Sequence, residues 1–393
     1  MPESNGDDQK KDEKKKEPSI EEVLKDNNYS KEWLLEHMEK NDAYKKAKSD
    51  RELKKIHVKN IGDGKGYCAQ VFRVTFEFDG SGEQDEFKIV MKIPTDEKIT
   101  ETFDQEELTD EIAENLRELA WQLHDREVQA FDVLKEIRST GYPLPDVYGS
   151  DHHGEERPGI LLMEDMSGRG AFVELLPQDA WSDFKDSVHI RKENEKEIKK
   201  KLKPVLEFRP EEQKGMVQSF MDLDIYEFCE HALRDVSEEK KASSLQHGDA
   251  WSHNVLFEKN EDGSISDRMT GILDWATCFE GNPLFDIARF MITCTDGEIR
   301  RECLLRVLAK HQKEPRFSRQ DVDTFYEWAA IRQTAGLVEL FASDGLPLFK
   351  KEGGDGDEEK GEKLWKRTLL GLEDAATLMK KYEVMEKFSS QKK

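Results

Sequence analysis

The chain has 393 residues, enough for one large two-lobed domain or for two ordinary domains with ample core. Its formal net charge of −24 disfavours non-specific binding to nucleic acid or to anionic membranes, because both need a basic surface. Five cysteines without a C-x-x-C pair indicate neither a disulfide framework nor a zinc site, and no apolar run is long enough to span a bilayer. We therefore expect a cytoplasmic protein with no membrane span.

The N-terminal part is predicted to contain a charged tail followed by two short helices. Residues 1–18 are rich in Lys, Glu and Asp and bury too little apolar surface to fold, so we predict a disordered tail. Ser19-Ile20-Glu21-Glu22 has the pattern of a capping box that begins a helix, and Ser30 is placed to cap a second one. Both helices are expected to pack on the outside of the first lobe.

The first predicted β region follows at Ile56–Ile93, and three glycines lie between its first two β-like runs. Val71–Phe78 alternates between apolar and polar residues, so its aromatic side chains share one face. Phe87–Ile93 is the next predicted strand, and it places Lys92 on the face of Val90, away from the larger apolar face. The glycines let backbone N–H groups approach a phosphate closely, although an ordinary hairpin turn explains them equally well; they are Gly62, Gly64 and Gly66.

The rest of the chain is predicted to be mainly helical after two more strands. Leu123–Glu127 is expected to open a helix with Asp125 as its N-cap, and Gly141 and Pro143 to end it. The further strands are Leu144–Gly149 and Ile160–Glu164, and the further helical segments are Ala171–Val188, Gly215–Leu233, 298–345 and about 363–387. A flexible acidic loop at Lys350–Glu362 and a polar tail at 388–393 complete the prediction. The fold class is α+β, with an N-terminal lobe at 19–166 and a helical C-terminal lobe at 167–387.

The stretch Leu245–Trp275 carries the most specific chemical signal. It reads as strand, polar loop, strand, turn and strand, and the turn predicts a hairpin that brings Asn254 and Asp274 close together. An amide oxygen and a carboxylate are hard ligands suited to Mg²⁺. Asp249 would lie beside that metal, which is a layout for phosphoryl transfer. Any one of these residues alone is more simply turn chemistry.

The pattern H-G-D-x-x-x-x-N, followed by an apolar strand that ends in Asp-Trp, resembles the choline kinase and aminoglycoside phosphotransferase superfamily. It is most similar to the choline-kinase-like family of nematodes and its ecdysteroid-kinase-like relatives. The resemblance covers roughly Ile56–Leu340 and implies a protein-kinase-like bilobal fold that uses ATP and Mg²⁺. It also implies roles for five residues: Asp249 is catalytic, Asn254 and Asp274 hold the metal, and His247 and Asp286 support the loop.

The resemblance extends to the nucleotide site. FKIVMKIP is similar to the kinase strand whose lysine contacts the phosphates, which implies that role for Lys92 and places Val90 against the adenine. The H-D-R-E segment implies Glu127 as the partner of Lys92, although the residues alone leave Glu118 as a rival. The glycines Gly62, Gly64 and Gly66 would cover the phosphates. The hinge to the second lobe would meet the adenine through Glu164, Asp165 and Met166.

Three functions remain open on the sequence. The first is an ATP-dependent phosphotransferase that acts on a hydroxyl of a choline-like, steroid-like or xenobiotic alcohol. The second is a catalytically weak or dead nucleotide-binding module, because Cys68 and Ala69 stand where related kinases often have a small hydroxyl residue. The third is a protein kinase, against which the short distance of 12 residues from Asp274 to Asp286 counts.

The acceptor and the oligomeric state stay undetermined. Trp251, Trp275 and Trp328 could line a site for a quaternary ammonium group, but tryptophans fit a hydrophobic core at least as well.

Overall fold

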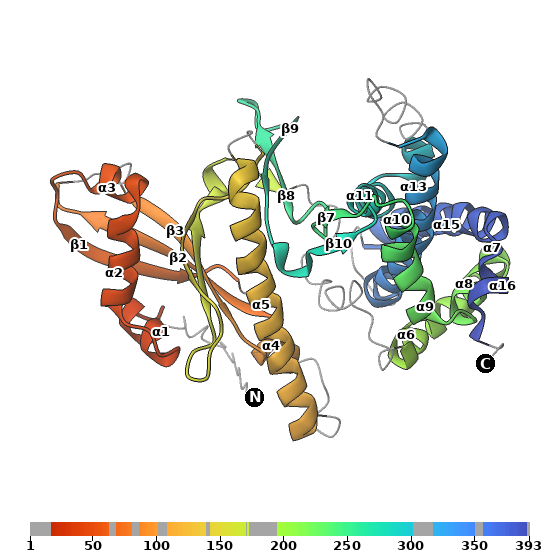
Figure 1. The fold of residues 1–393 in the computed structure, drawn as a ribbon, viewed down its shortest axis with the longest axis horizontal. Coiled ribbons are helices and arrows are strands. Elements are labelled where there is room, and N and C mark those ends of the chain that lie inside the picture. The colour runs from red at the N-terminus through yellow and green to blue at the C-terminus, as the bar shows by residue number, and fades with distance from the viewer. Residues whose placement is uncertain are drawn as a thin grey trace, which may run out of the picture.

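The computed structural model of the protein describes residues 17–62, 68–80, 86–100, 108–138, 142–169, 171–172, 195–301, 317–349 and 357–390. Nearly all of the predicted tail at 1–18 lies outside these residues, as do Gly64 and Gly66. Figure 1 shows a sheet flanked by helices, formed by the first part of the chain, and a body of helices formed by the last part. The predicted α+β, two-lobed fold is confirmed. No helix of the described stretches is long and apolar enough to cross a membrane.

The N-terminal lobe is built on a five-stranded antiparallel sheet with the strand order β1-β2-β3-β5-β4. Its strands are β1 (Leu53–Asn60), β2 (Ala69–Phe78), β3 (Phe87–Pro94), β4 (Val147–Asp151) and β5 (Ile160–Glu164). The alternation expected in β2 is present, since Phe72, Val74, Phe76 and Phe78 are all buried. The strand expected at Leu144–Gly149 begins later, at Val147, because the chain first passes the extended segment around Pro143 and Pro145.

Three short helices cover one face of this sheet: α1 (Ile20–Asp26), α2 (Lys31–Lys40) and α3 (Asp42–Lys48). The capping box at Ser19 and the cap at Ser30 form as expected, because each hydroxyl accepts a bond from a backbone N–H group of the first turn. Leu24, Leu34 and Met38 then pack on the apolar face of the strands in one hydrophobic cluster. The polar face of β3, which carries Lys92, lies on the side of the sheet opposite to these three helices.

The long helix α5 (Asp110–Arg138) covers the opposite face of the sheet. The prediction that Leu123–Glu127 opens this helix, with Asp125 as N-cap, is wrong, because these residues lie in its middle. The preceding turns are rich in Glu, Leu and Ala, which favour helix strongly enough to extend it toward the N-terminus. The Asp125 carboxylate instead binds the side chains of His152 and His153. The short helix α4 (Glu97–Thr100) precedes α5.

Between the two lobes lie short strands that present the polar loop found in the sequence (Figure 1). They are β6 (Ala171–Phe172), β7 (Ser244–Gln246), β8 (Val255–Lys259), β9 (Ile265–Ile272) and β10 (Phe279–Gly281). The strand, loop, strand, turn and strand expected for Leu245–Trp275 are all present. Ala171–Phe172, expected to be helical, is instead a strand that pairs with β8, and residues 173–188 of that predicted helix lie outside the described residues.

The C-terminal lobe is helical. Its main helices are α6 (Glu195–Glu207), α7 (Pro210–Gln213), α8 (Met216–Met221), α9 (Ile225–Glu230), α10 (Val236–Glu238), α11 (Phe285–Cys294), α13 (Arg319–Leu340), α14 (Leu346–Leu348), α15 (Asp357–Lys381) and α16 (Val384–Phe388). The single helix expected over Gly215–Leu233 is interrupted, because the Asp224 side chain caps a new helix. Trp328 lies in the large core of this lobe, whereas Trp275 packs in a second cluster against α5.

Two predictions near the C-terminus are corrected. The acidic loop expected at Lys350–Glu362 is helical from Asp357 onward, since Glu and Lys favour helix and Arg209 binds Glu362 at 2.8 Å. Residues 350–356 of that loop lie outside the described part. The tail expected from residue 388 is bound to the lobe through Ser390, whose backbone N–H donates to the carbonyl of Asp222 at 2.9 Å.

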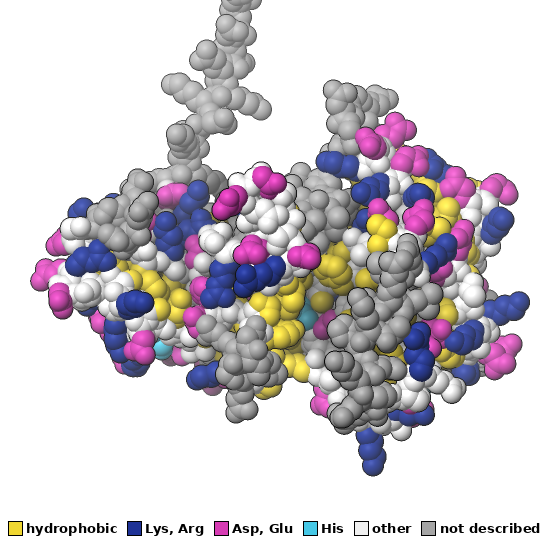
Figure 2. Space-filling view, turned by 90° about the horizontal axis from the view of Figure 1, so that it is seen from above, with side chains coloured by type: hydrophobic (Ala, Val, Ile, Leu, Met, Phe, Trp, Pro, Cys, Tyr) yellow, Lys and Arg dark blue, Asp and Glu magenta, His cyan; other side chains and the backbone are white. Residues whose placement is uncertain are grey.

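Charges of both signs share the surface. On the face shown in Figure 2, Lys and Arg side chains lie among Asp and Glu side chains over both lobes. The net charge of −24 therefore does not form one continuous acidic field on that face.

Candidate active site

Lys92 lies where the two lobes meet, and it is bound by two carboxylates. Its Nζ atom donates to Glu127 Oε2 at 2.6 Å and to Asp274 Oδ1 at 3.1 Å. Glu127 comes from α5 and is only 1% exposed, so its charge requires a partner. The structure thus brings together the predicted pair Lys92 and Glu127, and it adds Asp274 from the far lobe. Val90 lies on the same face of β3 and packs against the cluster that contains Trp275.

The loop that follows β7 is held from below by Asp286, in the first turn of α11. Its carboxylate accepts the backbone N–H of His247 at 2.6 Å and that of Gly248 at 2.9 Å. Burial raises the pKa of Asp286, while His247 and the two backbone donors act in the opposite direction. These contacts support the predicted bracing role of Asp286.

His247 connects the loop to the neighbouring hairpin. Its Nε2–H donates to the carbonyl of Leu273 at 2.8 Å, and its Nδ1 accepts the backbone N–H of Asp249 at 3.2 Å. Both ring nitrogens are therefore occupied by the backbone. This supports a structural role for His247, as expected, and leaves proton transfer to another group.

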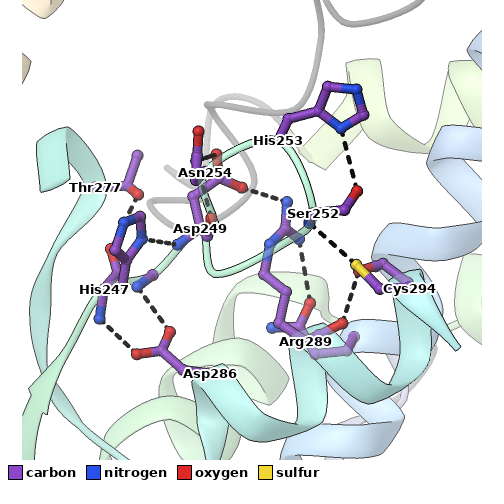
Figure 3. A network of polar contacts seen from close by, with 12 residues as sticks. His247, Asp249, Ser252, His253, Asn254, Thr277, Asp286, Arg289 and Cys294 are labelled. Atoms are coloured by element: carbon purple, nitrogen blue, oxygen red, sulfur yellow. Dashed lines mark hydrogen bonds and ion pairs between the residues drawn. The ribbon is translucent and has the colours of Figure 1, made fainter. Parts of the chain in front are cut away.

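Asp249 lies at the centre of this network, as Figure 3 shows. Asn254 Nδ2 donates to Asp249 Oδ2 at 2.9 Å and to the Asp249 carbonyl at 3.0 Å. The other carboxylate oxygen, Oδ1, forms an ion pair with Arg289 of α11. Both oxygens of the carboxylate are thus held in one orientation.

Asn254 and Asp274 fit a magnesium site by their chemistry. The backbone N–H of Leu273 donates to the carbonyl of Asn254 at 2.8 Å, so the hairpin places the two residues at the same end. Because the amide nitrogen of Asn254 points to Asp249, its amide oxygen points away from that carboxylate. The described residues contain no group of three or more His, Cys, Asp or Glu side chains placed to hold a metal. Mg²⁺ takes one or two protein ligands and completes its shell with phosphates and water, so an amide oxygen and a carboxylate such as those of Asn254 and Asp274 fit it.

The predicted nucleotide residues at the glycine turn and hinge are placed only in part. The N–H of Gly62 is already bonded, to the Val71 carbonyl at 3.1 Å and to Asn60 Oδ1 at 2.9 Å, so it ends the strand pair and does not point to a phosphate. At the hinge, Asp165 binds Arg73 and Glu164 binds Arg169, and Met166 is buried. The side chains of the hinge are therefore engaged with protein, and any adenine contact belongs to its backbone.

Arg289 is a residue of this network that sequence reasoning missed. Its signal was present: FDIARFM is an apolar helix with a single cation inside it, and a buried arginine requires a carboxylate partner. The identity of that partner could not be read from the sequence, since Asp249 is 40 positions away along the chain.

Two family models match the chain, each over less than half of its length. Residues 169–311, which carry the loop and the hairpin, match the ecdysteroid kinase-like family. Residues 38–170 match a family described as "Uncharacterized oxidoreductase dhs-27". The described part of that segment is an antiparallel sheet with a long helix, not the parallel doubly wound sheet that binds nicotinamide dinucleotides, so its geometry gives an oxidoreductase no support. The search of curated proteins gives no match.

Solved structures of low identity are also similar to the chain. They include an aminoglycoside phosphotransferase, APH(4)-Ia (13% identity, covering 82% of this chain and 96% of that one, TM-score 0.34). A Plasmodium vivax ethanolamine kinase is 12% identical, covering 91% of this chain and 92% of that one, with a TM-score of 0.34.

The predicted resemblance is confirmed for residues 169–311 in the part that names ecdysteroid-kinase-like relatives, since this segment matches that family. The narrower assignment to the nematode family stays a prediction. Together with the site geometry, the family match supports a phosphotransferase related to small-molecule kinases.

Proposed function

We propose that the protein transfers the γ-phosphoryl group of Mg-ATP to a hydroxyl group of a small molecule. The observation that carries the proposal is an unbroken series of contacts between the lobes. Glu127 binds Lys92, Lys92 binds Asp274, the Asp274 hairpin is bonded to Asn254, and Asn254 binds Asp249. Phosphoryl transfer needs this set of groups: a cation for the phosphates, oxygen ligands for the metal and a carboxylate for the attacking hydroxyl.

Each residue has a defined part in the proposal. Lys92, held by Glu127, contacts the phosphates, and Asn254 and Asp274 hold Mg²⁺. The metal would neutralise charge on the transferred phosphoryl group. Asp249 accepts a hydrogen bond from the acceptor hydroxyl and orients the hydroxyl oxygen toward the γ-phosphorus. As the new P–O bond forms, the bond from the γ-phosphorus to the β,γ-bridging oxygen breaks, ADP leaves, and Asp249 takes the hydroxyl proton.

The connection between Asp274 and α11 favours a small acceptor over a protein substrate. It is described without a gap, and it consists of a single 3₁₀ turn at Trp275–Thr277, strand β10 and a short loop. A protein kinase has a long activation segment at this place to bind its substrate peptide. The short connection gives a protein kinase no support.

The chemical nature of the alcohol is less constrained. Trp275 and Trp328 are buried in hydrophobic clusters, so neither supports the aromatic cage expected for a quaternary ammonium group. Choline-like, steroid-like and xenobiotic alcohols all remain candidates.

Replacing Asp249 tests the proposal by separating binding from turnover. Asp249→Asn keeps the size of the side chain and removes the charge that accepts the proton. We expect Mg-ATP consumption with a panel of alcohols to fall by about 10³-fold, while the dissociation constant of Mg-ATP, measured by calorimetry, changes less than about threefold.

The matched control is Asp267→Asn, an exposed aspartate of the same hairpin, which should leave both quantities unchanged. Equal turnover in wild type and Asp249→Asn would contradict the assignment. Binding of Mg-ATP without any turnover in wild type would favour the nucleotide-binding module.

A further inference from the structure

Helix α11 presents two charged side chains to the polar loop from positions three residues apart. Asp286 and Arg289 lie on the same face of the helix, since residues i and i+3 are neighbours there. Asp286 holds the loop backbone at His247 and Gly248, and Arg289 reaches the carboxylate of Asp249 (Figure 3). One face of α11 thus contacts both the main chain of this loop and the side chain of Asp249.

The ion pair between Arg289 and Asp249 is deeply buried. The residues are 2% and 6% exposed, so neither charge is compensated by water. A second arm of the guanidinium, Nη1, donates to Gln333 Oε1 of α13 at 3.3 Å, and Gln333 is itself 1% exposed. This arrangement fixes the guanidinium from two helices before it meets the carboxylate.

The contacts leave a defined place for an acceptor. Oδ1 of Asp249 is taken by Arg289, and Oδ2 accepts the amide N–H of Asn254. A carboxylate oxygen accepts more than one hydrogen bond, so Oδ2 keeps capacity for a hydroxyl proton. With both oxygens bound, rotation of the carboxylate about its last bond is restrained, and the acceptor meets the same oxygen in each turnover.

We infer that Arg289 is a positioning residue for phosphoryl transfer: it holds the Asp249 carboxylate oriented toward the acceptor hydroxyl. This inference rests on the proposed function. Arg289 touches neither nucleotide nor acceptor in this role, and its effect is exerted through Asp249 alone. Its loss should therefore lower kcat and leave the KM for Mg-ATP nearly unchanged.

The test compares Arg289→Met, which removes the charge, with Arg289→Lys, which keeps it. ADP release from Mg-ATP is measured with whichever alcohol of the panel gives the highest wild-type turnover. We expect kcat to fall about 100-fold in Arg289→Met and to recover to within about tenfold of wild type in Arg289→Lys. The KM for Mg-ATP should stay within about twofold in both.

The matched control is Arg300→Met. Arg300 is 3% exposed and pairs with Asp374 at 2.5 Å, so its replacement also removes a buried, paired arginine from the same lobe. We expect it to lower the thermal midpoint as Arg289→Met does, with kcat unchanged. If Arg289→Met does not fold, Gln333→Met removes only the second contact of Arg289. It should lower kcat severalfold without changing the KM for Mg-ATP.

The outcomes separate the two claims. If Arg289→Met has the same kcat as wild type, the positioning role is overturned and the proposed function stays intact. The same holds for Gln333→Met where that variant is used instead. A loss of kcat in Arg300→Met equal to that in Arg289→Met overturns it too, because instability then explains both. Wild-type turnover no higher than that of Asp249→Asn removes the proposed function, and the positioning role with it.

Discussion

At the scale of single residues, the largely buried charges of Lys92, Asp249 and Asp165 each have a partner of opposite charge. Lys92 binds Glu127 and Asp274, Asp249 binds Arg289, and Asp165 binds Arg73 at 2.6 Å. An uncompensated charge in such a position costs several kcal/mol, so removal of one partner affects the other. The site is therefore a set of coupled pairs, and its variants should be interpreted as pairs.

The pair at the hinge gives a pH prediction. Burial opposes ionisation of Asp165, but bonds from Arg73 and Ser167 outweigh it and lower the pKa of this carboxyl below its usual value. A lowered pKa in the folded state means that the contribution to stability is present above the unfolded value of about 3.9 and is lost as the pH falls through the folded value. We expect Asp165→Asn to lower the free energy of unfolding by about 2 kcal/mol at pH 6.

Urea unfolding at several pH values checks this. The difference between wild type and Asp165→Asn should shrink as the pH falls below 4 and the wild-type carboxyl becomes protonated. A difference that stays constant over this range would show that the Arg73 pair does not stabilise the hinge.

Among single residues, some of the site could be predicted from the sequence and some could not. Asp249, Asn254, Asp274 and Lys92 stood out because their spacing is rare and their chemistry is specific. Arg289 did not, because a cation in an apolar helix does not show which carboxylate it will bind. That partner is known only once the fold brings α11 next to the loop that carries Asp249. The contacts of Arg73 and Arg169 with the hinge carboxylates depend on tertiary structure in the same way.

At the scale of elements, the close approach of the polar loop to the 3₁₀ turn after Asp274 sets a strict requirement at Gly248. Its φ is +84°, and a Cβ atom there would lie 2.2 Å from the carbonyl oxygen of Thr277. Gly263, in the turn between β8 and β9, has a φ of +82° and open space around it. The two glycines share a backbone conformation and differ only in crowding.

Alanine at these two glycines separates strain from crowding. Gly263→Ala should cost about 1–2 kcal/mol of unfolding free energy, which is the penalty of the left-handed conformation alone. Gly248→Ala should cost about 3 kcal/mol or more and also reduce turnover, because the loop that carries Asp249 must move. Equal losses in the two variants, measured by urea unfolding, would contradict the close approach.

Element boundaries show where pattern reasoning succeeds and fails. The alternation of apolar and polar residues predicted strands β2 and β3 and the side of the sheet on which Lys92 lies. A sheet with one buried face gives its strands a hydrophobic pattern that repeats every two residues. The start of α5 was missed because Asp125 looks like a cap, and only the tertiary contacts with His152 and His153 reveal its other use. The strand at Ala171–Phe172 has only two residues, too few for any period.

At the scale of the whole molecule, the lobes meet through a few defined contacts. They include the hydrophobic cluster that joins α5 to Trp275 and the ion pair between Lys92 and Asp274. A ligand that binds both Lys92 and the Asp274 hairpin therefore bridges the lobes and stabilises the folded state by mass action.

The rise in protein stability on nucleotide binding measures how strongly such a ligand connects the two lobes. At a concentration about 100-fold above the dissociation constant, Mg-ADP should stabilise the protein by about 2.7 kcal/mol, seen as a rise in the thermal midpoint. EDTA should abolish most of the rise, because Asn254 and Asp274 reach the phosphates through the metal. Lys92→Met should reduce it as well, and Lys88→Met, an exposed lysine of the same strand, should not. An equal rise with and without EDTA would argue against a metal at Asn254 and Asp274.

The central claim is that this site transfers phosphate to a small alcohol, and the fate of a labelled γ-phosphate tests it most directly. Wild type and Asp249→Asn are incubated with labelled Mg-ATP and a small-molecule extract, and the label is followed into small molecules, protein and inorganic phosphate. The account predicts a labelled small molecule that is formed by wild type and is lost with Asp249→Asn. Label that enters added protein, or that remains in ATP with wild type, would contradict it.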